Sequence, residues 1–207
     1  MLISIEGNIG SGKSTIIEWL KTQNHVKVVF VDEPVNEWLT IKDKDGNNAL
    51  ECFYKDQKKN AFCFQILAYI TRLKKLMDTL KEHNDVIIIT ERSIETDRNV
   101  FAKMLYEDGL LSSIEWETYN YWFDTFKDIS KVDKIIYINT DPHKCIERIN
   151  KRNRVEESSI SIGYLIKCNN YHDNWLNTIN TDIIKIDGHN TVNEIRNEII
   201  DILINLI

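Results

Sequence analysis

The chain has 207 residues, 43% of them hydrophobic, and this length and apolar content predict one globular domain with a sizeable core, residues 1–207. Lys and Arg total 26 against 32 Asp and Glu, so the net charge of −6 argues against a general binder of nucleic acids or of membrane surfaces. The longest apolar runs have the length of strands and are too short to span a membrane.

The four cysteines are spread along the chain without a C-x-x-C pair or a metal-ligand spacing. We therefore expect them to be core thiols in a reducing compartment. The first predicted strand opens almost at residue 1, so we also expect no signal or transit peptide ahead of the fold. These features favour a cytoplasmic protein.

The chain opens with an apolar run at 2–5 that predicts a buried strand. Residues 7–15, GNIGSGKST, follow it and match the phosphate-binding P-loop pattern G-x-x-x-x-G-K-[ST]. Helical apolar spacing then runs to about Lys21. Such a loop points its backbone N–H groups at phosphate oxygens, and the positive end of the helix adds to the same site. The order of strand, loop and helix predicts a nucleoside triphosphate site.

Within the loop, we expect Lys13 to reach the β- and γ-phosphates and the Ser14 hydroxyl to ligate Mg²⁺. A glycine-rich turn that binds nothing is the alternative interpretation, and the flanking strand and helix argue against it. The loop residues expected to bind ATP are Gly7, Asn8, Ile9, Gly10, Ser11, Gly12, Lys13, Ser14 and Thr15.

A second strand is predicted at 26–31, after a turn at Asn24 and His25, and it is followed by Asp32-Glu33-Pro34. Proline stops the hydrogen-bond ladder, so Glu33 should lie at the carboxyl end of this strand. Ligands of open α/β sheets bind at that edge. Glu33 is therefore a candidate for the site.

The remaining chain alternates between predicted helices and strands. We expect a loop at 43–48, helices at 49–55 and 60–82, a strand at 85–90, a helix through Phe101 and Leu105, a helix at 113–129, a strand at 134–139, a helix opened by Thr140-Asp141-Pro142, a helix at 164–176, a strand at 182–186 and a final helix. This alternation predicts an α/β fold with five parallel strands and helices on both faces.

Glu91 follows the third predicted strand directly, so it should lie at the same sheet edge as Glu33 and the P-loop. Either carboxylate alone could be an ordinary surface group. Beside a P-loop, one would help to hold Mg²⁺ and the other could accept a proton from an attacking hydroxyl. Tyr54 and Glu157 could bind a sugar hydroxyl, although their spacing alone also fits surface residues.

Arg148 and Arg152 are four residues apart on one helix face, and Arg154 follows. A solvated basic face is the usual explanation of such a run. After the fourth strand of an acidic P-loop protein, we favour a closing lid at about 148–158. Its arginines would stabilise negative charge on the transferring phosphoryl group.

Polar and aromatic residues also coincide on two helices. Gln65, Tyr69 and Arg72 share one face of the long helix, and Asp97 and Phe101 share a face of the helix after the third strand. Aromatic residues on such helices are mostly core. Polar groups opposite rings nevertheless suit a flat heterocycle with polar edges.

Together these residues resemble the deoxyribonucleoside kinase family, which contains deoxycytidine, deoxyguanosine and insect-type multisubstrate kinases. The similarity covers nearly the whole chain and is carried by EGNIGSGKST (6–15), DEPVNEW (32–38), GNNALECFYKD (46–56), FCFQ (62–65), ERSIETDRNVFA (91–102) and RINKRNRVEE (148–157). The chain departs from the family after residue 56, where Gln57 and Asn60 stand in place of the usual Pro and Trp. We expect this corner between two helices to be built differently.

The resemblance implies a P-loop kinase fold and transfer of the ATP γ-phosphoryl group to the 5′-hydroxyl of a deoxynucleoside, in nucleotide salvage. It implies Glu33 as general base with Arg92 beside it, and Ser14 and Glu91 at Mg²⁺. The lid arginines would be Arg148, Arg152 and Arg154, the first two also at ATP; the base pocket would be Trp38, Phe64, Gln65, Arg72, Asp97 and Phe101; Tyr54 and Glu157 would hold the 3′-hydroxyl. A homodimer through helices that flank the pocket is also implied.

The choice of base can be predicted from three of these residues. An ionised Asp97 only accepts hydrogen bonds, so it favours the exocyclic amine of cytosine or adenine, with Arg72 beside it. Gln65 offers both a donor and an acceptor to the same edges, and guanine fits if Arg72 donates to its 6-oxygen. Thymine presents an acceptor and a methyl group there. We expect deoxycytidine, deoxyadenosine and deoxyguanosine ahead of thymidine.

Two other functions compete with this one. A nucleoside monophosphate kinase of the thymidylate kinase type shares the P-loop, the lid and a Glu-Pro after strand two, but typically has Asp-Arg where this chain has Glu91-Arg92. It also needs cations for an acceptor phosphate, whereas Glu33 and Glu91 make that zone acidic. A nucleotide-sensing module without turnover is the alternative from a different class.

Overall fold

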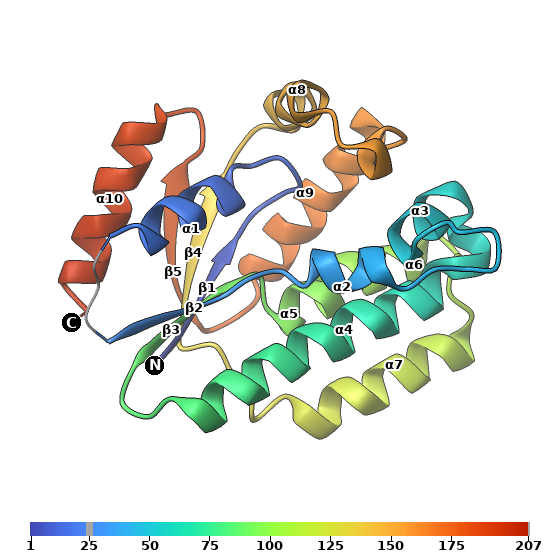
Figure 1. Ribbon diagram of the computed structural model, residues 1–207, viewed down its shortest axis with the longest axis horizontal. Helices are drawn as coiled ribbons and strands as arrows, with labels where there is room; N and C mark the ends of the chain where they lie inside the picture. The colour runs from blue at the N-terminus through green and yellow to red at the C-terminus, as the bar shows by residue number, and fades with distance from the viewer. Residues whose placement is uncertain (24–26, 207) are drawn as a thin grey trace.

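Five short apolar segments form one parallel sheet in the computed structural model, with the strand order β2-β3-β1-β4-β5 (Figure 1). The strands are β1 (Leu2–Glu6), β2 (Val28–Val31), β3 (Ile87–Glu91), β4 (Lys134–Asn139) and β5 (Asp182–Asp187). The structure describes residues 1–23 and 27–206, and of residue 155 only the backbone. The predicted α/β fold with five parallel strands is confirmed.

Helices cover both faces of this sheet. They are α1 (Lys13–Lys21) and α10 (Val192–Ile204) on one face, and α4 (Gln57–Glu82) and α9 (Ile162–Leu176) on the other (Figure 1). Successive side chains of a strand point to opposite faces, so Ile3 and Ile5 pack in the core under α1 and α10, while Leu2 and Ile88 pack in the core under α4 and α9. Burial on both faces explains the continuous apolar runs of the sequence.

The central strand β1 lies between β3 and β4. The chain passes from β1 to β2 and β3 on one side, and then crosses to β4 and β5 on the other. The strand order therefore reverses at β1. In open α/β sheets the crevice at the carboxyl end of such a strand is the ligand site, and here the P-loop occupies that position.

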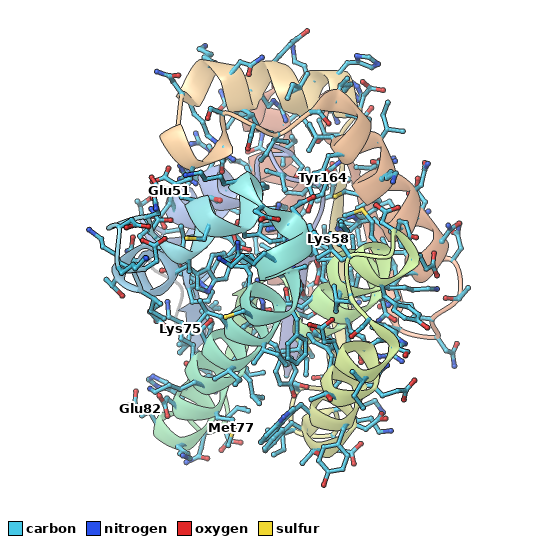
Figure 2. The ribbon with its side chains drawn as sticks, turned by 90° about the vertical axis from the view of Figure 1, so that its right-hand side faces the viewer. Glu51, Lys58, Lys75, Met77, Glu82 and Tyr164 are labelled. Atoms are coloured by element: carbon cyan, nitrogen blue, oxygen red, sulfur yellow. The ribbon has the colours of Figure 1, made fainter. Side chains whose placement is uncertain are left out.

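Shorter helices complete the fold. They are α2 (Val35–Thr40), α3 (Ala49–Lys55), α5 (Ile94–Thr96), the π-helix η1 (Asp97–Ala102), α6 (Lys103–Glu107), α7 (Ser113–Phe126), α8 (Pro142–Arg152) and the 3₁₀ turn η2 (Val155–Glu157). Figure 2 shows α4, which carries Lys75, Met77 and Glu82, running beside α7. Tyr69 and Tyr119 pack between these two helices.

Most predicted elements agree with the structure within a few residues. The strand predicted at 26–31 begins at Val28 within the described residues; Val26 and the turn predicted at 24–25 lie outside them. Helix α2 is not predicted from the sequence, because six residues directly after Pro34 are too few to show a helical apolar period. The helix predicted through Phe101 is interrupted by the π-helix η1, a rare form that often marks functional sites.

The corner after residue 55 is built without the Pro and Trp that the family usually has. Helix α4 starts at Gln57, three residues before its predicted start, because the Asp56 side chain accepts a hydrogen bond from the Lys59 N–H. The Asn60 side-chain amide donates to the carbonyl oxygens of Cys52 and Asp56, at 2.9 and 3.0 Å. Side-chain hydrogen bonds thus join α3 to α4.

No helix among the described residues is long and apolar enough to cross a membrane.

Candidate active site

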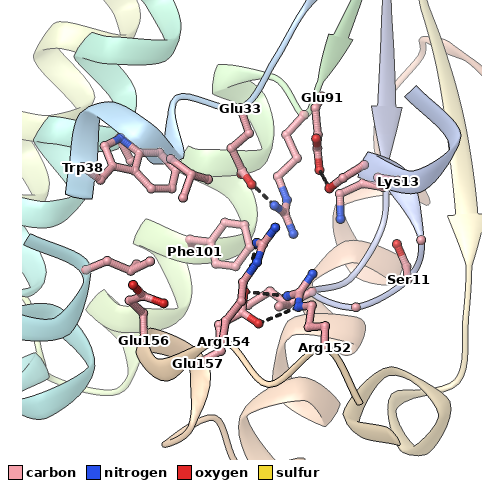
Figure 3. Close-up of a pocket in the computed structure, with 18 of the residues that line it drawn as sticks. Ser11, Lys13, Glu33, Trp38, Glu91, Phe101, Arg152, Arg154, Glu156 and Glu157 are labelled. Atoms are coloured by element: carbon pink, nitrogen blue, oxygen red, sulfur yellow. Dashed lines mark hydrogen bonds and ion pairs between the residues drawn. The ribbon is translucent and has the colours of Figure 1, made fainter. Parts of the chain in front are cut away.

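A cavity of about 670 Å³ opens at the carboxyl edge of the sheet, with the P-loop on one side and α2, α3, α4 and η1 on the other (Figure 3). Its lining includes all the predicted site residues except Gly7 and Asn8. The cavity has two parts. The acceptor half contains Glu33, Arg72, Arg92 and Asp97 with the aromatic residues around them, and the phosphate half contains the P-loop, Arg148, Arg152 and Arg154.

The P-loop is held by close packing. Gly12 precedes α1 with φ 108°, a conformation that favours glycine. A side chain on Gly10 would lie 2.6 Å from the Cys145 carbonyl oxygen, so the loop touches α8 directly. Asn8 is turned away from the cavity: its side-chain amide donates to the Leu165 carbonyl oxygen in α9. Of the predicted ATP-binding residues, Asn8 therefore fixes the loop rather than lining the cavity.

Lys13 is 3% exposed and lies within the loop that it is expected to serve. Its Nζ donates to the carbonyl oxygens of Gly7 and Asn8, at 3.0 and 2.8 Å. Burial lowers the pKa of Lys13 most, and the nearby Arg92 guanidinium lowers it further, to about 8. A phosphate oxygen would replace the two carbonyls and favour the charged ammonium.

Ser14 and Glu91 meet at the cavity wall. The Ser14 hydroxyl donates to Glu91 Oε1 at 2.7 Å, which brings together a hydroxyl and a carboxylate oxygen. Mg²⁺ takes such oxygen ligands together with water and phosphate oxygens, so the two residues fit the predicted metal site. Burial and the neighbouring Glu33 raise the pKa of Glu91 above its usual value, and a bound cation would reverse that direction.

Glu33 is the centre of a buried ion-pair network. Its Oε1 accepts from Arg92 Nη1 at 2.8 Å and from Arg72 Nη2 at 3.1 Å (Figure 3). Burial would raise the pKa of this carboxyl, but Arg92, Arg72 and Lys13 outweigh burial and lower the pKa of Glu33 to about 2. Glu33 is therefore ionised in the free protein over the whole physiological pH range.

Arg92 is aimed at Glu33 by an unusual backbone. Its φ is 61°, in the left-handed region that non-glycine residues rarely adopt. Arg92 Nη2 also donates to the Gly7 carbonyl oxygen at 3.3 Å, and the guanidinium lies 5.1 Å from the centre of the Phe101 ring. Arg92 thus contacts the general-base candidate Glu33, the P-loop and the Phe101 ring at once.

Glu6 is a buried carboxylate connected to the segment that carries Arg92, and it is not predicted from the sequence. The residue is 0% exposed, and its Oε1 accepts hydrogen bonds from the Ser4 and Ser93 hydroxyls at 2.5 and 2.9 Å. Ser93 follows Arg92 and also caps α5. A carboxylate directly before the P-loop glycine is the signal that could have drawn attention to it.

Aromatic rings wall the acceptor half. Trp38 and Phe64 pack edge to face with centroids 5.3 Å apart, and Phe53 stacks on Phe64 at 4.6 Å. Gln65 is 3% exposed, and its side-chain amide has no hydrogen-bond partner among the described residues, although it lines the cavity. An amide in this position is available to the edge of a planar ligand.

Arg72 connects the base pocket to Glu33. Its Nε donates to Asp97 Oδ2 at 2.8 Å, its Nη1 to the Glu91 carbonyl oxygen at 2.6 Å and its Nη2 to Glu33. Burial raises the pKa of Asp97, although the pair with Arg72 acts in the opposite direction. Tyr69, predicted on the same helix face, does not line the cavity; its hydroxyl donates to the Trp122 carbonyl oxygen.

The arginines after β4 make two kinds of contact. Arg148 donates to the Ser11 carbonyl oxygen at 2.8 Å and to the Gly188 carbonyl oxygen at 3.0 Å, so it joins the P-loop to the loop after β5. Arg152 forms a two-hydrogen-bond pair with Glu157, and Arg154 lies 3.6 Å from the same carboxylate. All three arginines line the cavity.

Tyr54 lines the cavity from α3 and lies 6.5 Å, centroid to centroid, from the Tyr164 ring of α9. Tyr164 also lines the cavity and is not predicted from the sequence. Only the tertiary structure brings it to the site, because more than a hundred residues separate the two tyrosines.

Comparison with known proteins gives a consistent result. The family described as deoxynucleoside kinase matches residues 3–207. The chain is 38% identical over 187 residues to the "probable deoxycytidine kinase" of fowlpox virus, covering 89% of this chain and 75% of that protein. It is 37% identical over 202 residues to deoxycytidine kinase 1 of Xenopus laevis (87% and 76%) and 32% identical over 199 residues to the mitochondrial deoxyguanosine kinase of the same organism (87% and 75%).

Proposed function

The chain belongs to the deoxynucleoside kinase family and is an ATP-dependent deoxynucleoside kinase, and from this premise we propose how its cavity performs the reaction. The deoxynucleoside occupies the acceptor half with its 5′-hydroxyl at Glu33, and the ATP phosphates lie over the P-loop. One observation carries this assignment: Arg92 donates to Glu33 and to the Gly7 carbonyl oxygen, so one guanidinium contacts both halves.

In the proposed reaction, the 5′-hydroxyl oxygen bonds to the γ-phosphorus, the bond from that phosphorus to the β,γ-bridging oxygen breaks, and ADP leaves. The hydroxyl proton passes to the Glu33 carboxylate. With a pKa of about 2, Glu33 is a weak base. A loose transition state requires little deprotonation before the new bond forms, so Glu33 acts first by orienting the hydroxyl and accepts the proton late.

Positive charge for the phosphoryl group comes from both sides of the cavity. Lys13 and the loop amides contact the triphosphate from the P-loop. Arg92 approaches from the acceptor half, and Arg152 and Arg154 approach from the proposed lid at about 148–158. Arg148 donates from α8 to the Ser11 carbonyl oxygen of the P-loop, which we assign to the ATP side. Ser14 and Glu91 would hold Mg²⁺, which neutralises charge on the phosphate oxygens when it is bound with ATP.

We propose that the base pocket prefers deoxycytidine, deoxyadenosine and deoxyguanosine over thymidine. The pair between Arg72 and Asp97 supports this preference, because it keeps a hydrogen-bond-accepting carboxylate in the cavity that Gln65 also lines. Thymine would set its O4 acceptor against that carboxylate. A buried group left unpaired costs about 1–3 kcal/mol, which corresponds to discrimination of roughly tenfold to a few hundredfold.

The proposed homodimer would form through α4 and α7. Large apolar side chains are exposed there: Ile70 on α4 is 45% exposed, and Ile114 and Tyr121 on α7 are 72% and 73% exposed. Exposed apolar groups gathered on neighbouring helices are typical of protein interfaces. Sedimentation should find a dimer that Tyr121→Arg converts to monomer; a monomeric wild type would contradict the proposal.

We also propose a cytoplasmic location, in keeping with its four free cysteines, two of which are buried thiols. Cell fractionation tests this assignment.

One assay tests the catalytic proposal. The purified chain is given Mg-ATP with each deoxynucleoside and each deoxynucleoside monophosphate in turn, and ADP release is followed. We expect ADP with deoxynucleosides and none above background with monophosphates. Release with monophosphates alone would favour the thymidylate kinase type of reaction, and ATP binding without release would favour a sensing module.

A further inference from the structure

Glu157 lies where the two halves of the cavity meet. Its side chain is 10% exposed and accepts hydrogen bonds from Arg152, Nε to Oε2 at 2.7 Å and Nη2 to Oε1 at 2.5 Å (Figure 3). Arg154 Nη1 lies 3.6 Å from the same Oε1. A carboxylate assigned above to the sugar thus also holds an arginine assigned to the phosphate.

The backbone between these residues explains why they meet. Asn153 ends α8 in the left-handed conformation, φ 51°, and the chain then makes the short turn η2. The Glu157 N–H donates to the Arg154 carbonyl oxygen, and the Glu157 carbonyl oxygen accepts from the Ile160 N–H. Both backbone polar groups of Glu157 are therefore hydrogen-bonded, and the turn brings its side chain back to Arg152 at the end of α8.

The geometry of the pair restricts Arg152 more strongly than a single contact would. Two parallel hydrogen bonds fix the plane of a guanidinium as well as its position. Arg152 is 31% exposed, whereas Glu157 is nearly buried, so the rigid partner is the carboxylate. A buried carboxylate that loses its cation also pays an uncompensated desolvation penalty, which favours the paired state.

The pair leaves room for the sugar. A carboxylate offers about four lone-pair sites, two on each oxygen, and Arg152 uses one on each. A sugar hydroxyl can donate to Glu157 from the cavity side without displacing the arginine. One residue can therefore bind the acceptor and hold the phosphate-side cation at the same time.

We propose that Glu157 is a positioning residue for phosphoryl transfer: it fixes the guanidinium of Arg152 at the edge of the phosphate half while it binds the sugar of the acceptor. This inference rests on the proposed function. It assigns to Glu157 an effect on kcat that is separate from its effect on nucleoside binding.

A double-mutant cycle tests the proposal, with kcat measured at saturating deoxynucleoside and Mg-ATP for Glu157→Gln, Arg152→Ala and the double variant. We expect Glu157→Gln to lower kcat roughly tenfold to a hundredfold, the range for a displaced catalytic group. In the Arg152→Ala background the same change should cost less than about threefold, because the residue it positions is already gone.

Glu156→Gln is the matched control, because it removes a carboxylate from the adjacent position of the same turn. Its effect on kcat, whatever its size, should multiply with that of Arg152→Ala. If Glu157→Gln does not fold, Glu157→Asp replaces it in the cycle, since the shorter side chain keeps the charge and loses the two-bond geometry.

Three results would overturn the inference. They are equal losses from Glu157→Gln in the two backgrounds, a Glu157→Gln variant that only raises the nucleoside KM, and an Arg152→Ala variant with the kcat of the wild type. Failure of the proposed function is a separate result, since the wild type would then release no ADP with any deoxynucleoside.

Discussion

The two halves of the cavity hold their charges differently. In the acceptor half, Glu33, Arg72, Arg92 and Asp97 are paired with one another, and each side chain is at most 17% exposed. In the phosphate half, Lys13 and Arg148 are held by backbone carbonyl oxygens, and Arg152 and Arg154 by one carboxylate. The acceptor set is fixed before substrate arrives, and so is Arg152 by its two hydrogen bonds to Glu157. Lys13 and Arg148, on neutral carbonyl oxygens, and Arg154, 3.6 Å from Glu157, can exchange partners.

This difference fits the ligands that we propose for the two halves. A nucleoside is neutral, so charges around it must be balanced by the protein, and the two carboxylates and two guanidiniums of the acceptor half cancel. The triphosphate brings its own negative charge, so the phosphate half keeps Lys13 and Arg148 on neutral carbonyl oxygens that phosphate oxygens can replace. The charges that face the nucleoside are thus preorganised, whereas Lys13 and Arg148 can release their carbonyl partners to phosphate oxygens.

The largest expected effect comes from breaking the centre of the acceptor half. Glu33→Gln keeps the size of the side chain and removes the proton acceptor, so kcat should fall by roughly a hundredfold or more. ATP binding, measured by calorimetry, should hardly change, because the P-loop is untouched. The control is Asp32→Asn, an exposed neighbour paired with Lys21 outside the cavity. Near-normal turnover of Glu33→Gln would exclude Glu33 as general base and leave it as an ordinary carboxylate at a strand end.

Changing the base pocket should shift substrate choice. We expect the double variant Arg72→Met, Asp97→Ala to move the ratio of kcat/KM values toward thymidine by roughly tenfold to a few hundredfold, since it removes the buried acceptor facing thymine O4. Arg72 also donates to Glu33, so kcat should fall for every substrate. The ratio is the correct readout because that common loss cancels.

The preference for other bases over thymidine is contradicted if the wild type has its highest kcat/KM with thymidine. It is also contradicted if the double variant keeps the wild-type ratio.

Removing Arg154 tests the phosphate half. Arg154→Ala should lower kcat by roughly tenfold, less than Glu33→Gln, and change the nucleoside KM little, because the charge that it meets develops during transfer. Arg154 is 50% exposed, so the fold should tolerate the change. Lys151→Ala, which removes a charge from the same segment outside the cavity lining, is the matched control. A raised KM with an unchanged kcat would exclude a lid role.

The smallest expected effect is a pH dependence of ATP binding. The pKa of Lys13 is lowered to about 8, so the ammonium persists below pH 8 and is lost as the pH rises through it. Phosphate binding favours the ammonium, so ATP affinity should fall about tenfold between pH 7 and 9, as the charged fraction of Lys13 falls from about nine-tenths to about one-tenth. In Lys13→Arg the charge remains and the profile should be flat. A flat wild-type profile would argue against the assignment.

Local features of this molecule could be predicted from the sequence because they depend on neighbouring residues. The P-loop is recognised from its glycines and Lys13, which lie within nine positions, and the strands are recognised from short apolar runs. Helix starts such as that of α3 follow from capping residues, here Asn48, whose side chain accepts from the Glu51 N–H. The resemblance of spaced motifs to a family then supplied the candidate list for the cavity.

Tertiary structure alone decided the partners of those residues. Arg72 was expected beside Asp97, but its bond to Glu33, 39 positions away, depends on how α4 packs on the sheet. Asn8 turned from the cavity to Leu165, 157 positions along the chain. Glu6 accepts a hydrogen bond from Ser93, 87 positions along the chain. Long-range hydrogen bonds follow from the packing of whole elements, which no local pattern encodes, and in this protein they determine which charges are fixed and which can move.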